Sequence, residues 1–160
     1  MRTTFDTNII LIDGRSGSGK TTFARALAHS RELDIVHMDD LYPGWKGLSA
    51  GAHTAAWMSA LLAAGHPARY SPWNWHNSTW DPERTLHPGG TIVFEGCGSL
   101  NLRTAPFSSE RYWLDVPAGI RRERATSRDQ DDTWWADWQA LEEDFYAQHQ
   151  PWRLATKVLT

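Results

Sequence analysis

The sequence predicts an α/β fold of the doubly wound type, a mostly parallel five-stranded sheet with helices on both faces. Five short and mainly apolar segments indicate strands: 9–12, 34–38, 91–94, 111–115 and 157–159. Segments with helical character lie between most of these strands. Alternating strands and helices are typical of parallel sheets, and strands buried on both faces run without polar breaks.

Length, charge and cysteine content limit the class of protein. A chain of 160 residues suffices for one compact domain with a sizeable core, so a single domain over 1–160 is expected. A net charge of −3 without a basic block disfavours nucleic acid as a main partner. Apolar runs too short to cross a bilayer, and an N-terminus without a signal-peptide core, disfavour a membrane. The single cysteine, Cys97, excludes an internal disulfide framework and indicates the cytoplasm.

The clearest motif follows the first predicted strand. Gly14, Gly19, Lys20 and Thr21 have the spacing G-x-x-x-x-G-K-[ST] of a phosphate-binding loop. Glycines let successive backbone N–H groups turn toward a phosphate, and a helix expected at 20–29 adds its positive end to the same anion. Lys20 is expected to reach the outer phosphates and Thr21 to ligate Mg²⁺, so the motif predicts ATP and Mg²⁺ as cofactors. The predicted nucleotide contacts here are Gly14, Ser16, Gly17, Ser18, Gly19, Lys20, Thr21 and Thr22.

The middle of the chain is predicted to be less regular. Residues 41–50 carry Pro and Gly and indicate a loop, and an Ala-rich helix is expected at 51–64. Residues 69–75 are compatible with an extended segment, although Pro72 argues against a central strand. Residues 76–90 are expected to form a loop, with at most one helical turn near Pro82.

Two helices are predicted in the last third of the chain. Pro117 suits the first turn of a helix that runs to about residue 128. A longer helix is expected at about 132–149, where the apolar spacing indicates a core-facing stripe. The stripe consists of Trp134, Trp138, Leu141 and Phe145.

Acidic residues follow two of the predicted strands. Asp39 and Asp40 come after the second strand and Glu95 after the third, and ligands of such sheets bind beyond the carboxyl ends of the strands. Glu95 is therefore a candidate for holding Mg²⁺ or its waters. Asp39 is the favoured candidate for accepting the proton of an acceptor hydroxyl, with Asp40 as second choice. The alternative for Glu95 is a solvated carboxylate at the strand end, and the alternative for Asp39 or Asp40 is a helix or turn cap.

Arginine and tryptophan side chains complete the predicted site. Arg121, Arg124 and Arg128 have the spacing of one helix face, which predicts a short lid at about 117–132 that closes over phosphates. A solvated helix face is the alternative. Trp73 and Trp75 lie in a predicted loop, where their rings are candidates for stacking on the acceptor.

In this order, the segments resemble the uridine kinase and nucleoside kinase-like branch of the P-loop kinases. The likeness rests on four segments: 13–22, His37-Met-Asp-Asp-Leu-Tyr42, Val93-Phe-Glu-Gly96 and 115–129. It implies a P-loop NTPase fold, Asp39 as the base that activates a sugar hydroxyl, and Glu95 in the Mg²⁺ shell. It also implies that Arg124 and Arg128 belong to a lid over ATP, with Arg121 at its start. The expected catalytic residues are Asp39, Lys20 and Arg121.

The resemblance also bears on the acceptor. Tyr42 falls where the family has an aromatic residue after the base. Trp73-Asn74-Trp75 looks like the family's aromatic-Asp-aromatic segment with Asn in place of Asp, and the expected histidine is at most His76, at a different spacing. Tyr42, Trp73, Asn74, Trp75 and His76 are therefore expected, together with Asp39, to bind the acceptor.

The leading hypothesis is an ATP-dependent kinase that moves the γ-phosphoryl group to a hydroxyl of a small molecule, most readily a nucleoside. The runner-up acceptors are a nucleoside monophosphate, a sugar acid or a foreign hydroxyl compound. An NTP hydrolase and a silent nucleotide-binding module are the other classes. No Asn-Lys-x-Asp segment of a GTPase occurs, and retention of Lys20, Thr21, Asp39 and Glu95 argues against a silent module. Monomer and homodimer are both open.

Overall fold

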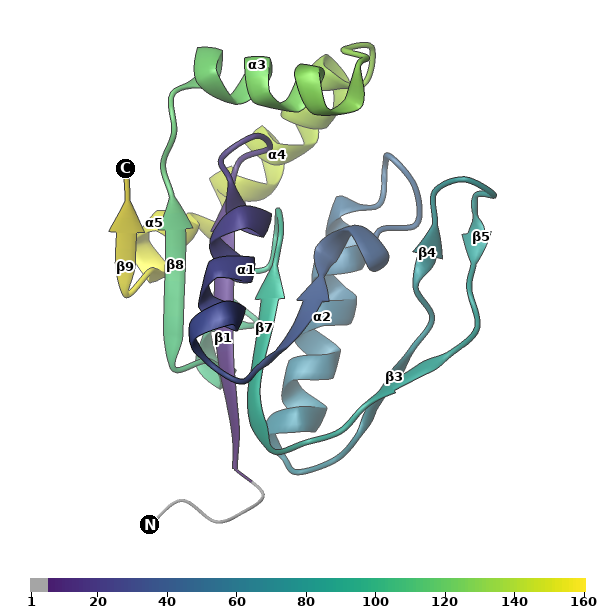
Figure 1. Ribbon diagram of the computed structural model, residues 1–160, viewed down its shortest axis with the longest axis vertical. Helices are drawn as coiled ribbons and strands as arrows, with labels where there is room; N and C mark the ends of the chain where they lie inside the picture. Colours follow the sequence, from purple (N-terminus) through teal and green to yellow (C-terminus); the bar gives the residue numbers. More distant parts are fainter. Residues whose placement is uncertain (1–5) are drawn as a thin grey trace.

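A five-stranded parallel sheet forms the centre of the computed structural model, which describes residues 6–160 (Figure 1). The strand order is β2-β7-β1-β8-β9, and each neighbouring pair is parallel. The strands are β1 (Thr7–Gly14), β2 (Asp34–His37), β7 (Gly90–Glu95), β8 (Glu110–Leu114) and β9 (Lys157–Leu159). The predicted fold class is thereby confirmed.

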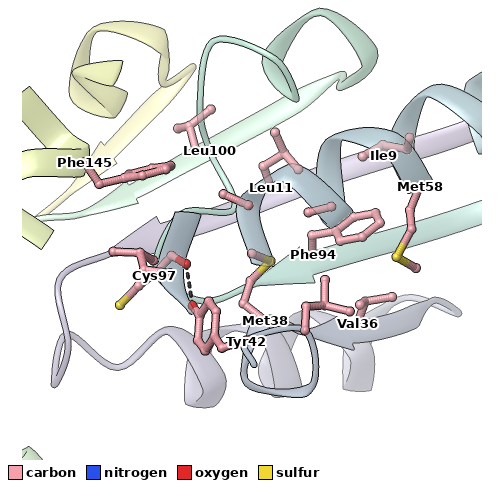
Figure 2. Close-up of a cluster of buried hydrophobic side chains, with 14 of the residues drawn as sticks. Ile9, Leu11, Val36, Met38, Tyr42, Met58, Phe94, Cys97, Leu100 and Phe145 are labelled. Carbon is pink, nitrogen blue, oxygen red and sulfur yellow. Dashed lines mark hydrogen bonds between the residues drawn. The ribbon is translucent and has the colours of Figure 1, made fainter. Parts of the chain in front are cut away.

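Helices cover both faces of this sheet because the residues of β1 alternate between two cores. Ile10 and Ile12 pack with Ala24 of α1 (Lys20–Ser30) on one face. Ile9 and Leu11 pack on the other face with α2 (Leu48–Ala63) and α4 (Trp135–His149), as Figure 2 shows for Met58 and Phe145. All four β1 side chains are at most 1% exposed. The unbroken apolar run therefore reflects burial on both faces.

The ends of several elements differ slightly from the predicted ones. Helix α2 begins at Leu48 and α4 at Trp135, each three residues from the expected start. Helix α3 (Ala118–Asp129) lies across the carboxyl ends of the strands in Figure 1. The short helical segments are η1 (Met38–Asp40), η2 (Ala105–Phe107) and α5 (Pro151–Leu154). Within residues 6–160, no helix has both the length and the apolar character required to cross a bilayer.

The prediction of a loop at 76–90 is wrong, because two short antiparallel ladders form an arm beside α2 (Figure 1). Strand β3 (Ala68–Tyr70) pairs with β6 (Arg84–Leu86), and β4 (Trp73–Asn74) pairs with β5 (Thr79–Trp80). The side chains of β5 are exposed and those of β6 mostly so. These strands therefore carry no apolar alternation that a sequence pattern would reveal.

Candidate functional site

A cavity of about 770 Å³ lies at the carboxyl ends of β1, β2 and β7, a volume within the usual range of small-molecule sites. Its lining includes the phosphate-binding loop from Ser16 to Thr22 except Ser18, together with Arg25 of α1. The other lining residues are Asp39, Tyr42, Trp45, Trp75, Glu95, Gly96, Cys97, Arg124, Ala125, Arg128, Asp129, Asp131, Trp134 and Trp138. Residues far apart in the sequence thus line one cavity.

The phosphate-binding loop has the local structure that its motif predicts. Helix α1 begins at Lys20, directly after Gly19 in the left-handed conformation (φ 90°). The Lys20 ammonium donates to the Arg15 carbonyl at 3.0 Å and the Ser18 hydroxyl at 3.4 Å. The first N–H groups of α1 and this ammonium therefore lie at the same end of the cavity, an arrangement suited to a phosphate chain.

Helices α3 and α4 hold this loop from its outer side. The Arg121 guanidinium donates to the carbonyls of Val116 at 2.9 Å and Ser16 at 3.3 Å. Ser16 is also a donor: its backbone N–H donates to the Glu142 carboxylate at 2.8 Å. Arg121 is 5% exposed and does not line the cavity. The structure thus makes Arg121 a contact of the loop's backbone, and its predicted contact with phosphate stays a prediction.

Glu142 is a buried site residue that the sequence analysis missed. Its carboxylate also accepts hydrogen bonds from Trp138 Nε1 at 2.9 Å, Gln139 Nε2 at 2.9 Å and the Cys97 thiol at 3.2 Å. The available signal was its spacing, four residues after Trp138 on the core-facing side of α4. Burial raises the pKa of the Cys97 thiol to about 12, which fits the structural role expected for this residue.

Asp13 anchors the start of the loop from within the core. Its carboxylate accepts hydrogen bonds from the N–H groups of Gly14 at 2.7 Å, Gly98 at 3.1 Å and Leu100 at 2.9 Å. The hydroxyl of Tyr146 donates to the same carboxylate at 2.8 Å. One buried side chain therefore ties β1, the segment after β7 and α4 together. Burial raises the pKa of Asp13 to about 7 from an ordinary value of 3.8.

This raised pKa predicts that the contribution of Asp13 to stability falls as the pH rises from about 4 to about 7. Over that interval the folded chain keeps the Asp13 proton while the unfolded chain releases it, so unfolding is favoured progressively and then levels off. At about 1.4 kcal/mol per pKa unit, the change is on the order of 4 kcal/mol. The check is chemical denaturation across this range. An Asp13→Asn variant is expected to lose this slope, and an unchanged slope would contradict the assignment.

Thr21 and Glu95 present the oxygen ligands that Mg²⁺ prefers. The Thr21 hydroxyl lies 3.1 and 3.2 Å from the two Glu95 carboxylate oxygens, and His37 Nδ1 lies 2.5 Å from one of them. Residues 6–160 contain no group of three acidic, histidine or cysteine side chains placed to hold a metal ion. A hydroxyl and a carboxylate nevertheless fit Mg²⁺, because this ion takes its other ligands from water and phosphate oxygens.

Asp39 faces the same cavity from η1, at the carboxyl end of β2. Loss of hydration within the cavity walls and the nearby charge of Glu95 raise the pKa of its carboxyl. Asp40 does not line the cavity; burial raises the pKa of its carboxyl, and the charges of His37 and Arg84 oppose that rise. Of the two candidate bases, the structure therefore places Asp39 at the cavity.

The predicted lid arginines divide into two groups. Arg124 and Arg128 line the cavity, unlike Arg121. The Arg124 guanidinium lies over Gly19, 3.9 Å from the position a Cβ would take there. Arg128 forms two hydrogen bonds with Asp129, at 2.8 and 3.0 Å. The arrangement suits the predicted ATP contact of both residues, which itself stays a prediction.

Of the tryptophan segment predicted to bind the acceptor, only Trp75 lines the cavity. Trp73 packs edge-to-face on Trp80, with ring centroids 4.9 Å apart, and its buried Nε1 has no hydrogen-bond partner within residues 6–160. The Asn74 side-chain oxygen Oδ1 accepts from the N–H groups of His76 and Asn77, so Asn74 shapes the turn of the arm. Acceptor binding by Trp73, Asn74 and His76 stays a prediction that this geometry does not support.

Aromatic residues outside the 73–76 segment line the cavity beside Trp75. Tyr42 lines the cavity, and its hydroxyl donates to the Cys97 carbonyl (Figure 2). Its predicted binding of the acceptor stays a prediction. Trp45, Trp134 and Trp138 also line the cavity. The sequence analysis missed Trp45, because it lies in an irregular loop without periodicity, and it assigned Trp134 and Trp138 to the core alone.

Solved structures of other proteins have a similar fold. The possible uridine kinase from Bacillus stearothermophilus matches with a TM-score of 0.69 at 20% identity, covering 99% of this chain and 91% of that one. A gluconokinase from Sinorhizobium meliloti 1021 matches with a TM-score of 0.54 at 16% identity, covering 99% and 82%. A shikimate kinase from Bacteroides thetaiotaomicron matches with a TM-score of 0.52 at 13% identity, covering 94% and 85%. These likenesses show a P-loop kinase-like fold.

Sequence comparison gives the family. A search of the curated proteins gave no match. The model of the AAA domain family, in contrast, matches residues 10–143, which include the phosphate-binding loop, both strand-end carboxylates and the arginines of α3. This match spans most of the chain, and the chain therefore belongs to the AAA domain family.

Proposed function

We propose that this chain is a phosphotransferase that moves the γ-phosphoryl group of ATP, with Mg²⁺, to a hydroxyl of a small molecule. One observation carries the proposal: Asp39 lines the same cavity as Lys20, Thr21 and Glu95. A nucleotide-binding loop alone would serve a hydrolase or a switch equally well. A carboxylate facing the phosphate end adds a group that can orient an acceptor hydroxyl and accept its proton.

Each residue then has a chemical role. Lys20 and the N-terminus of α1 would hold the outer phosphates, and Arg124 and Arg128 would cover them with further positive charge. Thr21 and Glu95 would hold the magnesium ion, which supplies charge neutralisation between the phosphates when bound. Asp39 would position the acceptor. The contacts of Arg121 and Glu142 with the loop would keep Ser16 in place.

The acceptor that the sequence resemblance implies is a nucleoside. The structural relatives include a possible uridine kinase, a gluconokinase and a shikimate kinase, so the shared fold admits acceptors of different chemistry. A hydroxyl group is common to all of these acceptors. The class of acceptor must therefore be inferred from the side chains that line the cavity.

The proposed function is tested by measuring ADP release with the full chain, ATP and Mg²⁺. The panel contains nucleosides, nucleoside monophosphates, sugars, sugar acids and ring-bearing alcohols, with a control lacking any acceptor. We expect ADP formation that depends on one class of acceptor, with phosphate recovered on that compound. Equal ADP formation without any acceptor would instead identify an NTP hydrolase.

A further inference from the structure

His37 contacts a proposed magnesium ligand from outside the cavity. Strand β2 forms one edge of the sheet and pairs in parallel with β7 (Figure 1), in a register that sets His37 directly beside Glu95. His37 Nδ1 lies 2.5 Å from Glu95 Oε1. The side chain of Glu95 is 5% exposed and that of His37 is 37% exposed, and His37 does not line the cavity. His37 therefore reaches the site through Glu95.

The two oxygens of the Glu95 carboxylate have different partners. Oε1 is held by His37 and lies 3.1 Å from the Thr21 hydroxyl. Oε2 lies 3.2 Å from the same hydroxyl and has no other hydrogen bond within residues 6–160. A carboxylate that binds Mg²⁺ is ionised and can only accept, so Nδ1 is the donor. His37 thus fixes Oε1, while Oε2 keeps lone pairs for the ion or for one of its waters.

Glu95 requires such a donor because its carboxylate has more than one orientation available. The last torsion of a Glu side chain has a broad energy minimum, so this torsion alone does not fix the group. Lys20 carries a charge that acts on Glu95, but its ammonium is bonded to the phosphate-binding loop. A carboxylate released from His37 would be drawn toward this ammonium, and their pairing would neutralise charge that the phosphates require. The contact with His37 keeps the carboxylate beside Thr21.

We propose that His37 is a positioning residue for the magnesium ion: it donates to Oε1 and thereby holds the Glu95 carboxylate beside Thr21, with Oε2 available to the ion. This inference rests on the proposed function and adds a residue to the support of its metal site. Hydrogen bonds from outer residues orient metal ligands and contribute strongly to metal affinity. His37 itself touches neither the nucleotide nor the acceptor in this arrangement.

Binding of the ion to the full chain tests this role without turnover. The chain is kept in excess over a non-hydrolysable ATP analogue so that all of the analogue is bound. Mn²⁺ is then titrated in as a paramagnetic substitute for Mg²⁺, and electron paramagnetic resonance reports the free ion. His37→Ala is expected to weaken Mn²⁺ binding about tenfold or more, the usual effect of losing an outer hydrogen bond to a metal ligand. Its affinity for the analogue in EDTA should equal that of the unchanged chain.

Two further variants separate the hydrogen bond from the bulk of the side chain. His37→Asn is expected to recover most of the affinity, because an amide N–H can replace the imidazole N–H as a donor to Oε1. His37→Val removes the donor but retains a residue that strands favour, so it repeats the test in a chain that keeps β2 intact. Equal losses in these two variants, or an equal loss of analogue affinity in EDTA, would overturn the inference.

His149→Asn is the matched control, because His149 is also a half-buried histidine but does not line the cavity. Its Nδ1 accepts the Leu102 N–H at 3.2 Å and its ring packs on Phe145. This variant should bind Mn²⁺ as tightly as the unchanged chain. A loss as large as that of His37→Ala would mean that the effect is not specific to Glu95, and the inference would fail.

Turnover separates this inference from the proposed function. Asp39 and Asp40 follow His37 closely in the sequence, so a fall in kcat alone would not identify the metal site. Unchanged Mn²⁺ affinity in His37→Ala, together with acceptor-dependent ADP formation, would overturn the inference and leave the proposed function intact. ADP release that requires no acceptor, from a chain whose Mn²⁺ affinity depends on His37, would overturn the proposed function alone.

Discussion

Asp39→Asn is expected to bind ATP as tightly as the unchanged chain and to lose acceptor-dependent ADP formation by about a hundredfold to ten-thousandfold. The amide retains the shape of the carboxylate but cannot accept the acceptor's proton. The arm should remain in place, because Trp75 Nε1 donates to the backbone carbonyl of Asp39 rather than to its side chain. The measurement is kcat with a saturating acceptor, together with equilibrium binding of a fluorescent ATP analogue.

Asp40→Asn is the matched comparison, since Asp40 is the neighbouring acid and does not line the cavity. This variant should keep most of its turnover. If Asp40→Asn loses turnover and Asp39→Asn keeps it, the two acids exchange roles. If both retain turnover, no general base in η1 contributes, and positioning and charge stabilisation would have to account for the reaction.

The central sheet could be predicted from the sequence because its signal is local. Ile9 to Ile12 form an unbroken apolar run, which is typical of a strand buried on both faces. The arm could not be predicted, since its strands are two or three residues long and largely exposed. Its turn depends on the Asn74 side chain, a contact that becomes visible only once the backbone is placed.

The candidate site likewise contains residues that the sequence could place and residues that it could not. Strand ends determine where Lys20, Asp39 and Glu95 must lie, so topology alone placed them near one another. Trp45 and Glu142 reach the site through tertiary packing. Trp45 stacks on Trp134, 89 positions further along the chain, at an interplanar angle of 19°, and Glu142 accepts the Ser16 N–H from α4. Trp45 leaves no periodic trace in the sequence, and the spacing of Glu142 from Trp138 indicates only a core-facing position on α4, not the group that Glu142 binds.

The phosphate-binding loop contacts the start of α3 at Gly17, where a side chain would not fit. Gly17 has φ +80°, and a Cβ placed there would lie 2.1 Å from the Arg121 carbonyl oxygen. Backbone atoms cannot rotate aside as a side chain can, so the loop or the start of α3 must move. Gly17→Ala is therefore expected to weaken ATP binding at least about tenfold and to lower the free energy of unfolding by several kcal/mol.

Gly65→Ala separates the two contributions to that loss. Gly65 has nearly the same backbone angle, φ +83°, but no atom of residues 6–160 lies within 4 Å of a Cβ at this position. Its alanine variant should incur only the strain of a left-handed residue, roughly 1–2 kcal/mol, and bind ATP normally. The excess loss in Gly17→Ala, measured by denaturation and nucleotide binding, then reports the steric contact with Arg121. Equal losses in both variants would mean that the loop and α3 can separate freely, and the rigid support assigned to Arg121 would fail with them.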